Sequence, residues 1–356
     1  MSDSSRFADS TFTLPKYLSL WNFTTTTPFL HIPSSELRSI FFAMEWYLRV
    51  IVNPIIGVFG IFGNVLSCVV LKRRGLHKSS DILLFTLSIV DTLVSTVTLD
   101  IARIATQIKT KSPLWNRVLD VDCSYTSPVG IMLYFSIISD AMYTFRIQTS
   151  SVICVYITVE RFIAIFYPLE FRQIVTTKRV WIILAGTMLT MGVYAVNAVR
   201  NLVPFLEYDA NRNVCFMHLA RIQNMVDDMI DNIVYYACSL VAMIIVITGI
   251  TAIGLKLIIV RKRRFTMTTS IKLTKSSLKT TKTLAAVCFL FSLTQIQRLP
   301  YTLDIGMDIE ISDMYYQLNE TLDYLNSGLN WLVYITLNDQ FKNMMVEMLC
   351  CLITKK

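Results

Sequence analysis

Apolar segments of membrane-spanning length alternate with short polar connections along most of this 356-residue chain. A helix needs about 20 predominantly apolar residues to cross the hydrocarbon core of a bilayer. Seven segments approach or exceed that length: Ile51–Leu71, Ile82–Leu99, Val129–Ala164, Val180–Val199, Asn232–Leu255, Thr283–Leu303 and Tyr315–Leu337. The pattern predicts an all-α membrane protein, with a seven-transmembrane helix bundle over residues 46–338.

The connections between these segments differ in charge. Residues 261–282 contain eight bases and no acid, whereas residues 304–323 contain six acids and no base. Because Lys and Arg collect in cytoplasmic loops, we expect residues 1–45 to form an extracellular N-terminal tail. The sequon Asn22-Phe23-Thr24 in that tail fits this topology, and Asn22 is a candidate for glycosylation.

Residues 339–356 follow the last span and are expected to be cytoplasmic. The apolar stretch Asp339–Leu352 is too short to cross a bilayer. Four of its apolar residues recur at helical spacing: Phe341, Met344, Met345 and Met348. This period predicts an amphipathic helix at the inner membrane surface. Cys350 and Cys351 near its end are candidates for palmitoylation.

The composition narrows the class of protein further. A chain that is 54% hydrophobic and only 16% charged has too little charge to cover the surface of a soluble domain. The net charge of +8 comes from basic inner connections, which favours contact with anionic lipid over nucleic acid. The sequence has no nucleophile–base pair, phosphate loop or metal-ligand spacing, so we expect neither an enzyme nor a cofactor. A seven-span transporter or channel is a remote alternative, because inverted repeats with paired Gly/Pro interruptions are not evident.

Polar residues inside the spans form stripes along helix faces. An ionisable group in mid-span costs about 2.5–3.5 kcal/mol on insertion scales, so each one needs a partner or a function. The last span carries one stripe: Glu320, Asp323, Asn326, Asn330 and Tyr334. The third span carries another: Asp140, Tyr143, Ser150, Cys154 and Arg161. With Asn64 and Asp91 in the first two spans, these faces are expected to converge on an internal cavity. Interhelical hydrogen bonding without a ligand is the alternative.

Two adjacent charged residues, Glu160 and Arg161, lie near the end of the third segment. One interpretation is that both side chains simply extend into the membrane interface. The other is a switch, in which the arginine is held by its neighbour in one state and released to a partner in another. The polar stripe that reaches Arg161 favours the switch.

Short motifs in four spans resemble those of rhodopsin-like (class A) G-protein-coupled receptors. The motifs are Gly63-Asn64-Val65, Leu87–Asp91, Glu160-Arg161-Phe162 with Pro168-Leu169, and Asn330–Tyr334. The resemblance covers residues 46 to 352. Residues 148–161 and 201–207 look most like invertebrate neuropeptide receptors of the FMRFamide type. Chemosensory receptors of the same fold share these features, so a receptor for a small odorant is an alternative.

The resemblance implies a mechanism and an ion site. Glu160 would hold Arg161 at rest, and Arg161 would be freed to contact a heterotrimeric G protein when the fifth and sixth spans move outward. Pro168, Leu169 and Tyr334 would belong to the same coupling region. Four residues match the internal sodium site of the family: Asp91, Ser150, Asn326 and Asn330. A structural Na+ ion is therefore expected as a negative modulator.

The sequence departs from the family pattern at several positions. The expected disulfide partner of Cys215 is Cys123, which lies 38 residues before Arg161 and therefore further away than is usual in the family. Phe162 and Trp331 replace the usual tyrosine and proline. The sixth span lacks its usual tryptophan, and the fifth span lacks its proline. These departures affect the details of activation more than the fold.

The ligand class is narrowed by exclusion. Tyr143 stands where amine receptors have an aspartate, and Tyr324 stands where opsins have the retinal lysine. Six acids form an outer rim that would attract a basic, amidated neuropeptide: Asp304, Asp308, Glu310, Asp313, Glu320 and Asp323. An acidic loop required only by topology is the alternative. The candidate ligand contacts are Asp140, Tyr143, Arg298, Glu320 and Asp323, although Arg298 could instead pair with one of the two last-span acids.

Overall fold

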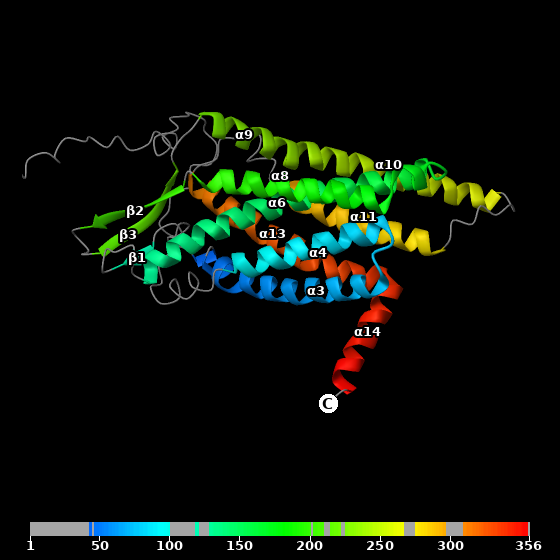
Figure 1. The fold of residues 1–356 in the computed structure, drawn as a ribbon, viewed down its shortest axis with the longest axis horizontal. Helices are drawn as coiled ribbons and strands as arrows, with labels where there is room; N and C mark the ends of the chain where they lie inside the picture. Colours follow the sequence, from blue (N-terminus) through cyan, green and yellow to red (C-terminus); the bar gives the residue numbers. More distant parts are fainter. Residues whose placement is uncertain are drawn as a thin grey trace, which may run out of the picture.

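The computed structural model describes residues 43–44, 46–99, 118–120, 128–200, 202–209, 214–221, 225–266, 275–296 and 309–354. Long helices lie side by side along the longest axis of the molecule (Figure 1). They are α3 (Asn53–Arg74, preceded by η1, Leu48–Val52), α4 (Ser79–Thr98), α6 (Pro128–Phe166), α8 (Thr177–Arg200), α9 (Met225–Tyr236) continued by η2 (Ala237–Val241) and α10 (Ala242–Thr266), α11 (Lys275–Ile296) and α13 (Ile309–Leu337). This arrangement confirms the predicted all-α membrane fold.

Five of the described helices are long and apolar enough to cross a membrane by length and composition. They are Leu48–Arg74, Ser79–Val97, Ile137–Phe166, Thr177–Arg200 and Met225–Ile259. The sixth predicted span is described as a shorter apolar helix, Thr281–Ile296. The seventh, α13, has 29 residues but carries the acidic stripe that lowers its mean hydropathy. The last two spans are thus the more polar part of the bundle.

A small antiparallel sheet lies at one end of the bundle, which we name the sheet end (Figure 1). Strands β2 (Leu202–Asp209) and β3 (Val214–Arg221) form a hairpin, and β1 (Val118–Asp120) pairs with β3. The hairpin was not predicted, because a single polar connection gives no hydrophobic repeat to read.

The helix α14 (Asp339–Thr354) begins at the opposite end, which we name the α14 end, and turns away from the bundle axis (Figure 1). Phe341 and Met348 are buried, and the Phe341 ring lies 5.6 Å from the ring of Tyr334 in an edge-on arrangement. The apolar face of α14 therefore packs against the bundle. An amphipathic helix was predicted here, and the helix is present.

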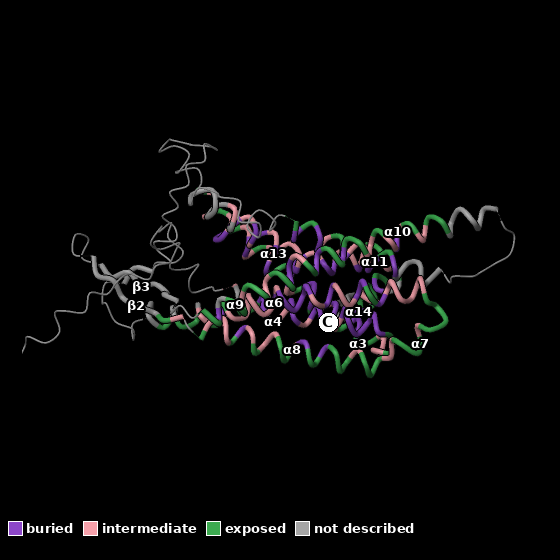
Figure 2. Tube along the Cα trace, turned by 90° about the horizontal axis from the view of Figure 1, so that it is seen from above, coloured by how far each residue is buried: buried purple, intermediate pink, exposed green. Residues whose placement is uncertain are grey.

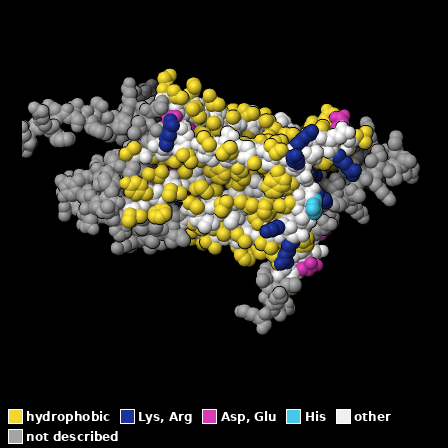
Figure 3. Space-filling view, viewed as in Figure 1, with side chains coloured by type: hydrophobic (Ala, Val, Ile, Leu, Met, Phe, Trp, Pro, Cys, Tyr) yellow, Lys and Arg dark blue, Asp and Glu magenta, His cyan; other side chains and the backbone are white. Residues whose placement is uncertain are grey.

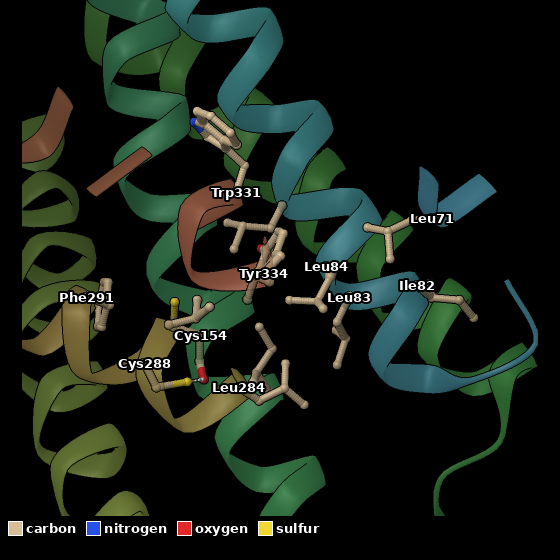
Figure 4. Packing of buried hydrophobic residues seen from close by; sticks show 14 of the residues in the cluster. Leu71, Ile82, Leu83, Leu84, Cys154, Leu284, Cys288, Phe291, Trp331 and Tyr334 are labelled. Atoms are coloured by element: carbon tan, nitrogen blue, oxygen red, sulfur yellow. Dashed lines mark hydrogen bonds between the residues drawn. The ribbon is translucent and has the colours of Figure 1, made fainter. Parts of the chain in front are cut away.

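The buried core runs through the middle of the bundle, whereas α8 is largely exposed along its outer face (Figure 2). Around the α14 end, Tyr334 of α13 lies among apolar side chains of α4, with Cys154 of α6 and Leu284 of α11 nearby (Figure 4). The outward-facing side chains of the spans are apolar and form a broad belt (Figure 3). A belt of this kind is what a bilayer core would cover.

Two of the spans contain π-helical turns. One, η1, precedes α3, and the other, η2, divides the fifth span between α9 and α10. The fifth span lacks the proline that is usual in the family, yet it is still interrupted by a wide turn at Ala237–Val241.

Helices α3 and α13 approach closely at glycines. A Cβ atom on Gly60 would lie 2.8 Å from the Cα atom of Gly328, so the two backbones are nearly in contact. One turn further along, a Cβ atom on Gly63 would overlap the indole ring of Trp331. Small residues permit such close packing of helices in membranes. The contact fixes α13 against α3 and so positions the polar stripe of α13.

Candidate functional site

The predicted switch pair is a close ion pair at the α14 end of α6. Arg161 donates from Nε to Oε2 of Glu160 over 2.6 Å and from Nη2 to Oε1 over 2.7 Å. The hydroxyl of Ser79, at the start of α4, donates to the same carboxylate over 2.5 Å. Glu160 is buried, with 4% of its side chain exposed, and Arg161 is 11% exposed. The pair is therefore satisfied within the protein and does not extend into solvent.

A small cavity adjoins Arg161. Side chains from three spans line it, including Arg161 of α6, Ile253 of α10 and Thr281 of α11. The cavity lies where the fifth and sixth spans meet the third. A movement of α10 or α11 away from α6 would widen this space beside the guanidinium.

The other predicted coupling residues differ in exposure. Leu169, just after the end of α6, is 92% exposed, and Pro168 is exposed beside it. Tyr334 is 1% exposed and packs in the core against Phe341. Leu169 is thus accessible to a partner, whereas Tyr334 is accessible only after the helices rearrange.

Asp91 is fully buried at the centre of the bundle. The side-chain amide of Asn330 donates from Nδ2 to Oδ2 of Asp91 over 3.0 Å, and the Ser150 hydroxyl lies beside the same carboxylate. Asn326, the fourth residue of the predicted ion site, is half-buried, and no hydrogen bond joins it to Asp91. The structure brings three of the four predicted residues together.

Arg146 is a buried residue that was not among the predicted site residues. It is 2% exposed, and its Nη1 atom donates to the Asp323 carbonyl oxygen over 3.2 Å and to Ser327 Oγ over 2.8 Å. Its guanidinium carbon lies 5.2 Å from the centre of the Tyr143 ring and 5.3 Å from that of Tyr324, so two aromatic faces flank the charge. The spacing that revealed the stripe could have found it, because Arg146 follows Tyr143 by three residues and precedes Ser150 by four.

Further hydrogen bonds join α13 to α6 and to α3. The Tyr143 hydroxyl donates to Asp323 Oδ2 over 2.7 Å, which ties α6 to α13. Asn64 donates from Nδ2 to the Ser327 carbonyl oxygen over 2.9 Å, which ties α3 to α13. We name the set Asn64, Asp91, Tyr143, Arg146, Ser150, Asp323, Ser327 and Asn330 the central network. It joins α3, α4, α6 and α13 in the interior of the bundle.

The remaining candidate ligand contacts lie towards the sheet end. Asp140 is exposed on α6, one turn beyond Tyr143. Glu320 is within 3.8 Å of Arg49 Nε, and Arg49 also donates a hydrogen bond to Gln317 of α13. Arg49 was not among the predicted residues, although it is buried beside the acidic stripe. Arg298, the predicted partner of these acids, lies outside the described residues.

The predicted modification sites are only partly described. Asn22 and Cys123 lie outside the described residues. Cys215 belongs to β3, where its Cα pairs with that of Asp120 in β1, three residues before Cys123. Cys350 is exposed on α14, and Cys351 follows it in the same helix.

Comparison with known proteins agrees with this geometry. The family model of the 7 transmembrane receptor (rhodopsin family) matches residues 63–334. The match therefore begins at the glycine under Trp331, ends at Tyr334 and includes the central network and the Glu160–Arg161 pair. No curated protein sequence matches the chain. The chain belongs to the rhodopsin family of seven-transmembrane receptors, and it is a receptor and not an enzyme.

Proposed function

We propose that this receptor binds a basic, amidated peptide at the sheet end and activates a heterotrimeric G protein at the α14 end. The observation that carries the proposal is the pairing of Arg161 with Glu160 beside a cavity between α6, α10 and α11. A charge that is held in the resting structure next to movable helices is suited to transmit a signal. The two ends are joined by α6, which carries both Tyr143 and Arg161.

The proposed orientation follows from the charges at the α14 end. Figure 3 shows Lys and Arg side chains gathered there. Exposed bases on elements at this end are Lys72, Arg73, Lys78, Arg172, Lys178, Arg179 and Lys342. Basic residues flank the cytoplasmic ends of spans. This supports a cytoplasmic α14 end, with the N-terminus and the sheet outside.

Activation in this proposal is a shift between two states. In the resting state the Glu160 carboxylate accepts hydrogen bonds from Arg161 and Ser79, which holds α6 against α4. When α10 and α11 move outward, the adjoining cavity opens and Arg161 turns towards the G protein. A ligand favours this state only by the difference between its affinities for the two states.

The proposed ligand contacts are the acids of the stripe. Asp323 accepts a hydrogen bond from Tyr143, and Glu320 lies next to Arg49, so both acids are engaged in the resting structure. A basic group of a peptide would compete with these partners for the carboxylates. Competition for Asp323 would loosen the link between α6 and α13, which lies one turn from Arg146. Asp140, exposed on the same face of α6, provides a further negative charge for the ligand.

The outer sheet supports a further part of the proposal. Strand β1 lies against β3, and Asp120 is opposite Cys215. Cys123 follows Asp120 by three residues in the sequence, which supports the inclusion of a Cys123–Cys215 disulfide. Glycosylation of Asn22 and palmitoylation of Cys350 and Cys351 complete the proposed topology.

A G-protein activation assay in cells tests the proposal, with a library of amidated peptides and small odorants as ligands. We expect a basic amidated peptide to activate the receptor and Arg161→Ala to reduce the response more than about tenfold. Arg172→Ala, which removes an exposed arginine at the same end, is the matched control for loss of charge. Activation by odorants alone would contradict the peptide assignment, and ion flux without G-protein dependence would contradict the receptor mechanism.

A further inference from the structure

Arg146 places a permanent positive charge inside the central network. Its side chain is 2% exposed, and it lies on the same face of α6 as Ser150, one turn away. Arg146 Nη1 donates to Ser327 Oγ, and Ser327 lies three residues before Asn330, whose side-chain amide donates to Asp91, so the guanidinium and the Asp91 carboxyl group belong to one cluster of buried polar side chains. An arginine cannot lose its proton at any pH that a cell reaches. The buried carboxylate therefore has a counter-charge that belongs to the protein chain itself.

The guanidinium is held in place by several contacts. Nη1 donates to the Asp323 carbonyl oxygen and to Ser327 Oγ of α13, and the guanidinium carbon lies over the rings of both Tyr143 and Tyr324. Nε and Nη2 have no hydrogen-bond partner among the described residues. Two donor groups of the buried cation are thus left for the polar interior around Asp91.

The residues around Asp91 do not fit a bound Na+ ion while Arg146 is in place. An ion at Asp91 and the Arg146 guanidinium would be two like charges in one buried site, where repulsion is stronger than in water, so ion binding is weakened. Asn330 also directs its amide nitrogen, and not its oxygen, towards Asp91, and Asn326 makes no hydrogen bond to that carboxylate. Sodium prefers oxygen ligands and an uncompensated negative charge. We therefore no longer expect a sodium ion at Asp91.

The oxygen groups that could hold such an ion are nevertheless present. Asp91, the Ser150 hydroxyl and Asn330 lie together, and Asn330 Oδ1 has no hydrogen-bond partner among the residues that the structure describes. Rotation of the Asn330 amide would present this oxygen to a cation. The charge of Arg146 is what prevents the site from taking one.

We propose that Arg146 is the internal cation of this receptor and occupies, at Asp91, the role that a mobile sodium ion would otherwise take. The resting state is then stabilised by a charge that does not depend on the salt outside the cell. The proposal concerns the stability of the resting structure. It needs neither a ligand nor a G protein, so its failure would leave the proposed function untouched, and the reverse also holds.

Thermal unfolding of the purified full-length receptor in detergent tests the proposal, with NaCl compared against KCl and choline chloride at equal ionic strength. We expect the wild-type Tm to be the same in the three salts. Arg146→Gln removes the charge and keeps a polar side chain, so its Tm should rise by about 2–4 °C in NaCl relative to the other salts. The double variant Arg146→Gln/Asp91→Asn should lose this sodium-specific rise. Arg179→Gln, which removes an exposed arginine on α8, is the matched control and should behave as the wild type.

Three outcomes would overturn the proposal. The first is a wild-type Tm that rises specifically in NaCl and loses that rise in Asp91→Asn. The second is a folded Arg146→Gln variant with the same Tm in all three salts. If Arg146→Gln does not fold, the single variant Asp91→Asn, in which Arg146 is intact, tests the proposal instead. Because it removes a buried carboxylate from the cluster that contains Arg146, it should lower the Tm equally in every salt. A decrease found only in NaCl is the third contradicting outcome.

Discussion

The indole of Trp331 fills the space left by the missing side chain of Gly63, so the two residues fit together across the α3–α13 interface. Trp331 is 8% exposed, and its ring lies 4.8 Å from that of Phe59 on the same face of α3. Trp331 stands where the family usually has a proline. The tryptophan at this position thus packs into the glycine of the neighbouring helix.

Gly63→Ala should destabilise the receptor by roughly 1–3 kcal/mol, because the added methyl group would overlap the Trp331 ring in a closely packed interface. Thermal unfolding of the purified receptor measures the loss. The matched control is Gly186→Ala on α8, where a Cβ atom meets nothing within 4 Å. There, alanine should be neutral or should stabilise the helix by up to about 1 kcal/mol. Equal effects at Gly63 and Gly186 would contradict the fit.

The double variant Gly63→Ala/Trp331→Leu tests the same contact from the other side. Leucine is smaller than tryptophan and leaves room for the alanine methyl group. We expect the loss in the double variant to be less than the sum of the two single losses by at least about 1 kcal/mol, as for residues in direct contact. Strict additivity in the unfolding measurements would show that the two side chains do not oppose each other.

Glu160→Gln should raise the basal activity of the receptor several-fold. The change removes the negative charge that holds both the Nε and the Nη2 groups of Arg161, so the released state becomes easier to reach. G-protein activation without ligand, normalised to surface expression, is the measurement. Ser79→Ala removes one hydrogen bond to the same carboxylate and should raise basal activity less. Basal activity that falls or stays constant in Glu160→Gln would count against the resting pair.

Tyr143→Phe should weaken the link between α6 and α13, because it deletes the hydroxyl that donates to Asp323 over 2.7 Å. The loss of a hydrogen bond to a charged group costs about 1.5–3 kcal/mol. In a double-mutant cycle with Asp323→Asn, the two variants should be non-additive. Tyr156→Phe is the control, since its hydroxyl contacts Thr187 of α8 outside the central network. Its combination with Asp323→Asn should be additive.

The ion pair between Arg200 and Asp227 at the sheet end should contribute less to stability than the hydrogen bond between Tyr143 and Asp323. Arg200 donates from Nη2 to both carboxylate oxygens of Asp227 over 2.9 Å, which joins α8 to α9. The Arg200 side chain is 52% exposed, so solvent screens the pair, and Arg200→Ala should cost no more than about 1 kcal/mol. The loss should also shrink at high salt. A salt-independent loss of several kcal/mol in thermal unfolding would contradict this.

Hydrophobic length and helical spacing were enough to predict the spans, the amphipathic helix after them and the convergence of Asp91, Ser150 and Asn330. These features depend on one helix at a time or on stripes that repeat along it. The β2–β3 hairpin could not be predicted, because a connecting loop has no membrane or core that imposes a periodic pattern. The same holds for the partners of Glu320, since Arg49 is 271 positions away in sequence and only the packing of α3 against α13 brings them together.

The fit of Trp331 to Gly63 was also out of reach, because a glycine and a tryptophan in separate segments carry no joint signal in one sequence. Arg146 is a different case. Its spacing to Tyr143 and Ser150 placed it on the polar stripe, and the cost of a buried guanidinium should have marked it.

The wide turn at Ala237–Val241 changes the directions in which the side chains of α9 point. A π-helical turn holds one more residue than an α-helical turn over the same stretch of helix, and each residue of an α-helix turns the chain by about 100°. Every residue of α9 is therefore rotated by about that angle from where an uninterrupted helix would place it. Counting back from α10 as though the helix were uninterrupted would therefore assign the residues of α9 to the wrong face of the helix.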